Sequence, residues 1–255
     1  MVRPLLRTAL NAANAILRPL NVGIIRIDSG GPGHHPASPE IPHGMVLPRA
    51  TYSPWLADDE FMRCYEIVRN RTLVDQYRCY ELWQLGRQLA SLPGSFLEVG
   101  VWRGGTGCLL AHAAPGKAVY LADTFTGVVK AGTQDTRYTG GEHADTSETI
   151  VRELAEELGA TNIHILRGIF PEDTGDEVSG PIALLHCDVD VYSSAKDIVE
   201  WAMPRLLPGA VVVFDDYGFR GCEGITRLVN EIRERPGFRF VHNLNGHAIL
   251  IHTAQ

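Results

Sequence analysis

The stretch FLEVGVWRGGTG, residues 96–107, joins an apolar run to a turn that contains four glycines. The apolar residues predict a buried strand over 95–100, and GTGCLLAHAA, residues 105–114, predicts the helix that follows the turn. A strand, a glycine turn and a helix in succession form the ligand-binding corner of open α/β sheets. The stretch therefore indicates an α/β fold with a ligand site at the end of this strand.

The rest of the chain repeats this alternation of apolar segments and helical patterns. We expect further strands at 117–125, 162–170, 181–190 and 209–218, and helices at 146–159, 193–207 and 224–236. Residues 238–252 predict a hairpin that turns at Asn245 and Gly246. Together these elements predict a mostly parallel seven-stranded sheet with an antiparallel C-terminal hairpin and helices on both faces.

The N-terminal part of the chain differs in composition. Residues 1–26 place arginines among apolar residues, which predicts a short amphipathic helix that packs on the domain or on a partner subunit, with contact to a membrane surface as the alternative. No apolar run reaches the roughly 20 residues that a membrane span requires. Residues 28–54 are rich in Gly and Pro, which predicts a loop that forms part of a lid. We therefore divide the chain into a helix and lid segment, residues 1–55, and an α/β domain, residues 56–255.

The composition excludes some classes of function. The chain has 255 residues, is 45% hydrophobic and carries a net charge of −7, so it can bury one full core and lacks the basic field that nucleic-acid binding requires. Its five cysteines have no zinc-binding spacing, which favours reduced and buried thiols in a cytoplasmic protein.

Glu98 and the spacing of the glycines restrict the ligand of the turn. The GxGxxG fingerprint of dinucleotide sites is absent, and a carboxylate beside the turn would repel a pyrophosphate. S-adenosylmethionine fits better, because it carries an ammonium and a sulfonium group and no phosphate. Asp123 ends the next strand, close to the position about 20 residues after the turn where an acid binds ribose hydroxyls in doubly wound folds. A tight turn without a ligand is the alternative interpretation of the glycines alone.

Four aspartates follow two of the expected strands. Asp188 and Asp190 end the strand at 181–190, and Asp215 and Asp216 end the strand at 209–218. Because adjacent parallel strands lie about 4.8 Å apart, we expect the four carboxylates to meet beside the methyl donor. Four carboxylates held this close together cost free energy unless a cation neutralises them. Mg²⁺ is the expected ion, because it prefers oxygen ligands such as carboxylates. The ion would lower the pKa of an acceptor hydroxyl, and one of the carboxylates would take the proton of that hydroxyl. The alternative is that some of the aspartates only cap helices.

With these residues, the chain resembles the macrocin O-methyltransferase family, which includes the tylosin, mycinamicin and novobiocin sugar-modifying methyltransferases. The resemblance rests on LEVGVWRGGTG (97–107), LADTFTG (121–127), ILRGIFPEDT (165–174), HCDVDVYSSAKDIVEWAMPRLLPGAVVVFDDYG (186–218) and, more loosely, RNRTLVDQYRCYELWQL (69–85). It implies a class I methyltransferase fold of Rossmann-like type, S-adenosylmethionine as donor and Mg²⁺ as metal.

The resemblance also implies roles for individual residues. The metal ligands would be Asp188, Asp215 and Asp216. Asp190 would be the general base or an orienting acid, and Asp188 would also belong to the catalytic residues. His143, in the loop GGEHADTS, would approach the acceptor. The residues implied to contact the donor are Glu98, Gly100, Val101, Trp102, Gly104, Gly105, Thr106, Asp123, Thr124, Ser147 and Asp188, with helix capping as the favoured role of Ser147.

The expected function is Mg²⁺-dependent O-methylation of a hydroxyl on a sugar, a glycosylated natural product or a polysaccharide. Arg137, Tyr138, Tyr192 and Trp55 are candidate acceptor-side residues. The alternatives are O-methylation of a non-sugar hydroxyl such as a phenol or catechol, and metal-dependent hydrolysis, although the phosphate-binding motif GxxxxGK[ST] is absent. We expect a small-molecule or glycoside acceptor, no nucleic-acid partner and a homo-oligomer.

Overall fold

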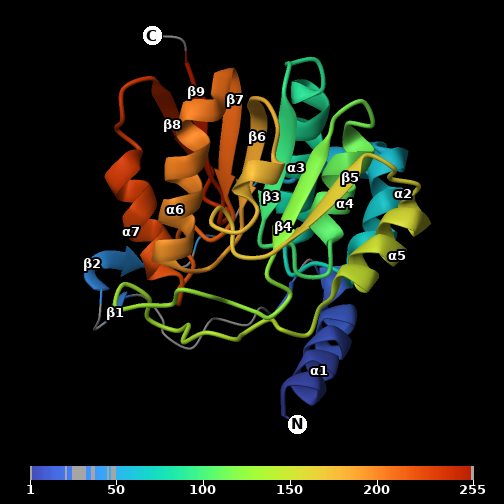
Figure 1. The fold of residues 1–255 in the computed structure, drawn as a ribbon. Helices are drawn as coiled ribbons and strands as arrows, with labels where there is room; N and C mark the ends of the chain where they lie inside the picture. Colours follow the sequence, from blue (N-terminus) through green and yellow to red (C-terminus); the bar gives the residue numbers. More distant parts are fainter. Residues whose placement is uncertain are drawn as a thin grey trace.

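The central sheet has seven strands in the order β5-β4-β3-β6-β7-β9-β8. Figure 1 shows it in the computed structural model, which describes residues 2–20, 22–24, 33–35, 38–44, 46 and 50–253. All neighbouring strands are parallel except at β9, which is antiparallel to β7 and β8. The strands are β3 Ser95–Val99, β4 Val119–Asp123, β5 Ile163–Arg167, β6 Ile182–Cys187, β7 Leu206–Phe214, β8 Phe238–His242 and β9 Ala248–His252. The predicted sheet and its C-terminal hairpin are confirmed.

Helices cover both faces of this sheet (Figure 1). One apolar core joins the sheet to α2–α5, and a second joins it to α6 and α7. Successive strand residues enter opposite cores, as Phe96 and Leu97 of β3 do, because side chains alternate along a strand. The helices are α1 Val2–Leu17, α2 Asp59–Val68, α3 Gln76–Leu89, α4 Gly105–Ala113, α5 Glu148–Leu158, α6 Tyr192–Ala202 and α7 Glu223–Ile232, with short 3-10 helices η1 Arg18–Leu20, η2 Pro54–Ala57, η3 Gly175–Glu177 and η4 Met203–Arg205.

The order of the strands places the switch point of the sheet between β3 and β6. From β3 the chain proceeds outward through β4 and β5, and then returns to add β6 and β7 on the other side of β3. Ligands of open α/β sheets bind at the carboxyl ends of the strands beside such a reversal. Gly100 follows β3 with a φ of 91°, and a Cβ at this position would lie 1.6 Å from the carbonyl oxygen of Asp188. Only glycine therefore permits the two loops to approach this closely.

The N-terminal segment contains more structure than its composition suggested. The region expected to be a loop holds an antiparallel hairpin of β1 Gly33–His35 and β2 Ser38–His43. Arg227 of α7 binds this hairpin, with Nη2 donating to Glu40 Oε1 at 2.5 Å and to Ser38 Oγ at 3.2 Å. These contacts between distant residues, which local composition does not encode, account for the difference.

The helix expected at the N-terminus is present as α1, and in Figure 1 it extends away from the sheet. Within the part of the chain that the structure describes, no helix is long and apolar enough to cross a membrane. All five cysteines are unpaired and buried, as their spacing predicted.

Candidate active site

A cavity of about 380 Å³ lies at the carboxyl ends of β3, β4, β6 and β7. The sequence-predicted site residues that line it are Gly100, Asp123, Thr124, His143, Asp188, Asp190, Asp215 and Asp216, together with the acceptor-side candidates Arg137 and Tyr138. The long connection between β4 and α5 crosses beneath the strand ends and forms one wall (Figure 1). The cavity thus brings the glycine turn and the aspartates together.

Asp123 organises the glycine turn. Its Oδ2 accepts the backbone N–H groups of Val101 and Trp102, both at 2.8 Å, and its Oδ1 accepts that of Phe125 at 2.7 Å. Burial raises the pKa of Asp123, and these three hydrogen bonds offset part of that rise. Val101 and Trp102 do not themselves line the cavity. Their backbone sets the shape of the turn, while Asp123 itself lines the cavity.

The residues after the turn pack against neighbouring segments. Gly104 begins α4 with a φ of 86°, and a Cβ on Gly105 would lie 2.7 Å from the carbonyl oxygen of Arg71. Trp102 Nε1 donates to Asp145 Oδ1 at 2.9 Å, which ties the turn to the β4–α5 connection. These positions shape the glycine turn from outside the lining of the cavity.

Glu98 is fully buried and is not among the lining residues. Thr106 Oγ1 donates to its Oε1 at 2.9 Å, and His186 Nδ1 lies 3.1 Å from its Oε2. The carboxylate is therefore shared by two side chains beneath the switch point, outside the lining of the cavity.

The aspartates at the ends of β6 and β7 form a compact group. Carboxylate oxygens of Asp188, Asp215 and Asp216 all lie within 4.8 Å of one another. Burial, followed by the charge of the neighbouring aspartates, raises the pKa of Asp188 and of Asp216 well above their ordinary values. Three oxygen donors that repel one another at a cavity wall fit a hard divalent cation such as Mg²⁺, which would remove this repulsion.

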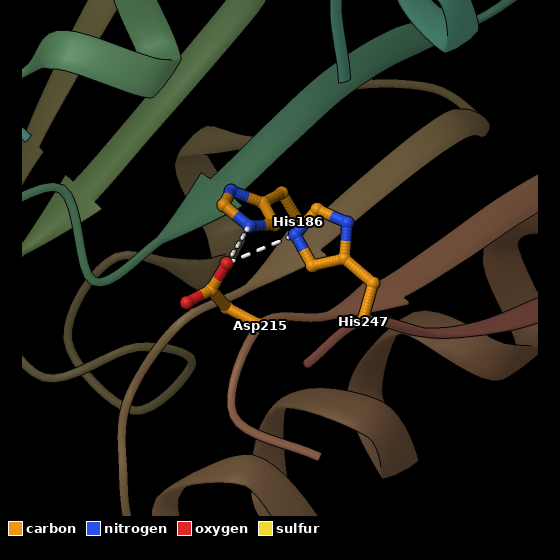
Figure 2. Close-up of side chains that lie close together, drawn as sticks. All are labelled: His186, Asp215 and His247. Atoms are coloured by element: carbon orange, nitrogen blue, oxygen red, sulfur yellow. Dashed lines mark hydrogen bonds and ion pairs between the residues drawn. The ribbon is translucent and has the colours of Figure 1, made fainter. Parts of the chain in front are cut away.

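Asp215 has cationic and imidazole partners of its own. Arg78 Nη1 donates to Asp215 Oδ2 at 2.5 Å, and His247 Nε2 lies 2.9 Å from Oδ1. Figure 2 shows that His186 approaches the same carboxylate, with its Nε2 3.7 Å from Oδ1. Burial alone would raise the pKa of Asp215, but its contacts with the two imidazoles and the charge of Arg78 outweigh burial and hold it below its ordinary value.

Asp190 and His143, the two candidates for the general base, face one another across the cavity wall. His143 Nε2 lies 3.9 Å from Asp190 Oδ2, and Tyr138, which also lines the cavity, lies close enough to influence the pKa of Asp190. The backbone N–H of Asp190 donates to Asp216 Oδ2 at 3.2 Å. Asp190 has a φ of 64°, an uncommon conformation for a residue other than glycine. Burial raises its pKa, and the interaction with Tyr138 partly opposes the rise.

Three further predicted residues lie away from the cavity. Ser147 caps α5, where its side chain accepts the N–H of Ile150 at 3.3 Å, so the favoured role as a cap is confirmed. Trp55 packs edge-on against Tyr77 of α3, with ring centroids 5.1 Å apart. Tyr192 donates its hydroxyl to Glu231 of α7 at 2.7 Å. Trp55 and Tyr192 do not line the cavity, since each is taken up by packing between helices.

A family model described as Macrocin-O-methyltransferase (TylF) matches residues 69–240. The chain belongs to the macrocin O-methyltransferase family. The match contains the glycine turn, Asp123 and the four aspartates of the cavity, which are the features that the sequence analysis singled out. Residues before 69 and after 240 lie outside it.

Two bacterial relatives are similar over the central part of the chain. The 8-demethyl-8-(2,3-dimethoxy-alpha-L-rhamnosyl)-tetracenomycin-C 4'-O-methyltransferase of Streptomyces olivaceus is 30% identical over 160 residues, which are 57% of this chain and 60% of that protein. The mycinamicin III 3''-O-methyltransferase of Micromonospora griseorubida is 30% identical over 162 residues, 57% of this chain and 63% of that protein. The chain therefore spans less than two thirds of the length of either relative.

Solved structures show the same fold. The O-methyltransferase NovP superposes with a TM-score of 0.62 at 23% identity, over 72% of this chain and 83% of that one. The calicheamicin methyltransferase CalS11 gives a TM-score of 0.58 at 18% identity, over 82% of this chain and 98% of that one. The fold of this family member is therefore that of the class I methyltransferases.

Sequence reasoning missed the side chains that surround Asp215. His186 could have been identified from the sequence, because a histidine within the apolar strand LLHC requires a buried hydrogen-bonding partner. No sequence pattern indicates Arg78 and His247 as partners of Asp215, since they are separated from it by 137 and 32 residues along the chain. Asp145, which ties the β4–α5 connection to the turn, was missed for the same reason.

Proposed function

We propose that this member of the macrocin O-methyltransferase family transfers the methyl group of S-adenosylmethionine to a hydroxyl on the sugar of a glycosylated acceptor, with Mg²⁺ at Asp188, Asp215 and Asp216. The observation that carries the proposal is the shared cavity, which places the turn held by Asp123 and the aspartate group around one space of about 380 Å³. The names of the relatives, which refer to a rhamnosyl-tetracenomycin and to mycinamicin III, support a glycosylated acceptor.

The donor would occupy the part of the cavity nearest β3 and β4. Asp123 would bind the ribose hydroxyls, as acids at this position do in doubly wound folds. Gly100 and Asp188 both line the cavity, with the carbonyl oxygen of Asp188 where a Cβ on Gly100 would stand, so the two residues would border the amino-acid end of the donor. Glu98, Thr106 and the glycines of α4 would maintain this shape, and the buried charge of Glu98 would favour a cationic ligand.

Transfer requires an activated acceptor oxygen. Bound Mg²⁺ would supply a Lewis acid that lowers the pKa of the hydroxyl. Asp190 takes the hydroxyl proton, and its position beside the metal ligands is set by its uncommon backbone conformation and by the hydrogen bond from its N–H to Asp216. The acceptor oxygen forms a bond to the methyl carbon as the carbon–sulfur bond breaks, and the electron pair of that bond returns to sulfur. His143, 3.9 Å from Asp190, would stabilise the carboxylate or accept the proton from it.

The N-terminal segment would complete the acceptor side. His43 Nε2 of β2 lies 3.1 Å from Glu223 Oε1, and Glu223 Oε2 accepts the N–H of Gly221 at 3.0 Å, next to the lining residue Cys222. The hairpin is thereby fastened to the loops that bound the cavity. This contact supports a lid role for residues 1–55. We also propose that the protein forms a homo-oligomer in which α1 provides contacts between subunits.

The test combines donor binding with methyl transfer. Calorimetry should show that S-adenosylhomocysteine binds, and labelled S-adenosylmethionine with Mg²⁺ should methylate members of a panel of rhamnosides and other deoxysugar glycosides. Chelation of the metal should abolish transfer. Donor binding with transfer only to a catechol would replace the sugar acceptor with a phenolic one, and the absence of donor binding would refute the proposal.

A further inference from the structure

Beneath the aspartate group, a buried histidine connects α3 to Asp215. His247, just before β9, has no exposed surface. Its Nε2 lies 2.9 Å from Asp215 Oδ1, and its Nδ1 lies 2.5 Å from Oε2 of Glu81 in α3. Figure 2 shows the ring directed at the carboxylate of Asp215. Because an ionised carboxylate can only accept, Nε2 is the donor in the contact with Asp215.

Glu81, which contacts Nδ1 of His247, is itself held in place by hydrogen bonds. Glu81 Oε1 accepts a hydrogen bond from Asn243, and Asn245 Nδ2 lies 3.4 Å from Oε2 of the same carboxylate. Asn245 Oδ1 in turn accepts the backbone N–H of His247 at 2.9 Å. The loop between β8 and β9 therefore fixes Glu81, and Glu81 fixes the plane of the imidazole.

His247 differs from the neighbouring imidazole of His186. His186 Nε2 stands 3.7 Å from Asp215 Oδ1 and makes no hydrogen bond to it. His247 is thus the imidazole at hydrogen-bonding distance from Oδ1, while Arg78 occupies Oδ2. Without these donors, repulsion from Asp188 and Asp216 would favour rotation of the Asp215 carboxylate away from them.

We infer that His247, oriented by Glu81, is a positioning residue that holds Asp215 in the conformation needed to bind a divalent cation with Asp188 and Asp216. The inference rests on the proposed function, because it requires Asp215 to be a metal ligand. Hydrogen-bonding partners of metal ligands commonly control affinity in this way. His247 lies outside residues 69–240, so the family match does not supply this role.

Two substitutions at one position separate the hydrogen bond from the packing of the ring. His247→Gln keeps an N–H donor that can reach Asp215, and His247→Leu fills similar space without a donor. His252→Leu is the matched control, because His252 lies on β9 and its Nδ1 contacts the carbonyl oxygen of Leu207 instead of the site. Binding of Mg²⁺ and Mn²⁺ is measured by calorimetry on the full chain, with S-adenosylhomocysteine affinity and thermal unfolding measured in parallel.

We expect His247→Leu to weaken metal binding by about 10–100-fold, with His247→Gln remaining within a few-fold of the wild type. Affinity for S-adenosylhomocysteine should be unchanged in both variants, and His252→Leu should bind metal normally. Wild-type metal affinity in a folded His247→Leu would overturn the positioning role, as would an equal loss in folded Leu and Gln variants. A stoichiometric transition metal that is present in the purified wild type and absent from folded His247→Leu would mean that His247 is itself a metal ligand. That result would also overturn the positioning role. Failure of the wild type to bind any divalent cation would instead refute the metal part of the proposed function and this inference together.

Discussion

The two sides of the cavity are built in different ways. The donor side consists of the strand–turn–helix corner of β3 and α4 and of the end of β4, where the carboxylate of Asp123 holds the turn through backbone N–H groups. The metal side is assembled from α3, β6, β7 and the C-terminal hairpin, and side-chain charges hold it together around Asp215. The donor side therefore depends mostly on contacts between β3 and β4, which follow one another along the chain, whereas the metal side combines segments that are far apart along it.

The difference has an energetic side. Three backbone N–H groups donate to the half-buried carboxylate of Asp123 and offset part of the rise in its pKa that burial causes. Asp188 and Asp216 have raised pKa values, and Arg78 and His247 both contact Asp215 instead. Burying unbalanced charge is costly, so the metal side gains most from a bound cation.

The largest expected effect is on the metal side. Asp190→Asn should lower kcat by about 10²–10⁴-fold, because it removes the group that we propose takes the acceptor proton. Single-turnover methyl transfer measures the effect, and binding of S-adenosylhomocysteine serves as the control. A kcat near that of the wild type would reassign the base, and His143→Gln would then be the next variant.

Gly100→Ala should break the contact between the two sides. Its Cβ would lie 1.6 Å from the carbonyl oxygen of Asp188, at a φ of 91° that disfavours alanine. We expect a loss of about 3 kcal/mol in the free energy of unfolding, from overpacking together with backbone strain. Urea denaturation measures it, and Gly116→Ala is the control, since nothing lies within 4 Å of a Cβ there. Equal stability of the two variants would contradict the close approach of the loops.

Asp123→Asn should damage the donor side selectively. An amide cannot accept all three backbone hydrogen bonds, and its NH₂ group would face N–H donors. Affinity for S-adenosylhomocysteine should fall by about 10–100-fold, which corresponds to the loss of one charge-assisted hydrogen bond. Metal affinity should stay as in the wild type. A parallel fall in metal affinity would show that the two sides are not independent.

The smallest effect is expected at the edge of the donor side. Asp145→Ala removes the contacts with Trp102 and with Arg103, whose Nη2 lies 2.7 Å from Asp145 Oδ2. The ion pair is mostly exposed, and such pairs contribute about 0–1 kcal/mol. The KM for S-adenosylmethionine should rise no more than a few-fold with kcat unchanged. A large fall in kcat would mean that the β4–α5 connection orders the catalytic residues as well.

Most of the fold could be predicted from the sequence, because its signals are local. Continuous apolar strands, the glycine turn and the Asn245–Gly246 hairpin each depend on neighbouring residues. The hairpin of β1 and β2 could not be predicted, since it depends on Arg227, 187 residues from Glu40. For the cavity, the sequence indicated Asp123 and the four aspartates, but it placed Trp55 and Tyr192 on the acceptor side because aromatic residues look alike whether they pack between helices or line a site.

By itself, the sequence determined which groups stand at the ends of the strands, because a parallel sheet aligns the carboxyl ends of its strands whatever the details of packing. Only the tertiary structure decided what each carboxylate meets there. Glu98 is enclosed by Thr106 and His186, whereas Asp215 receives Arg78 and His247. These partners come from separate helices and strands, and their interactions act over a few ångströms, so they are set by how the layers pack and not by spacing along the chain.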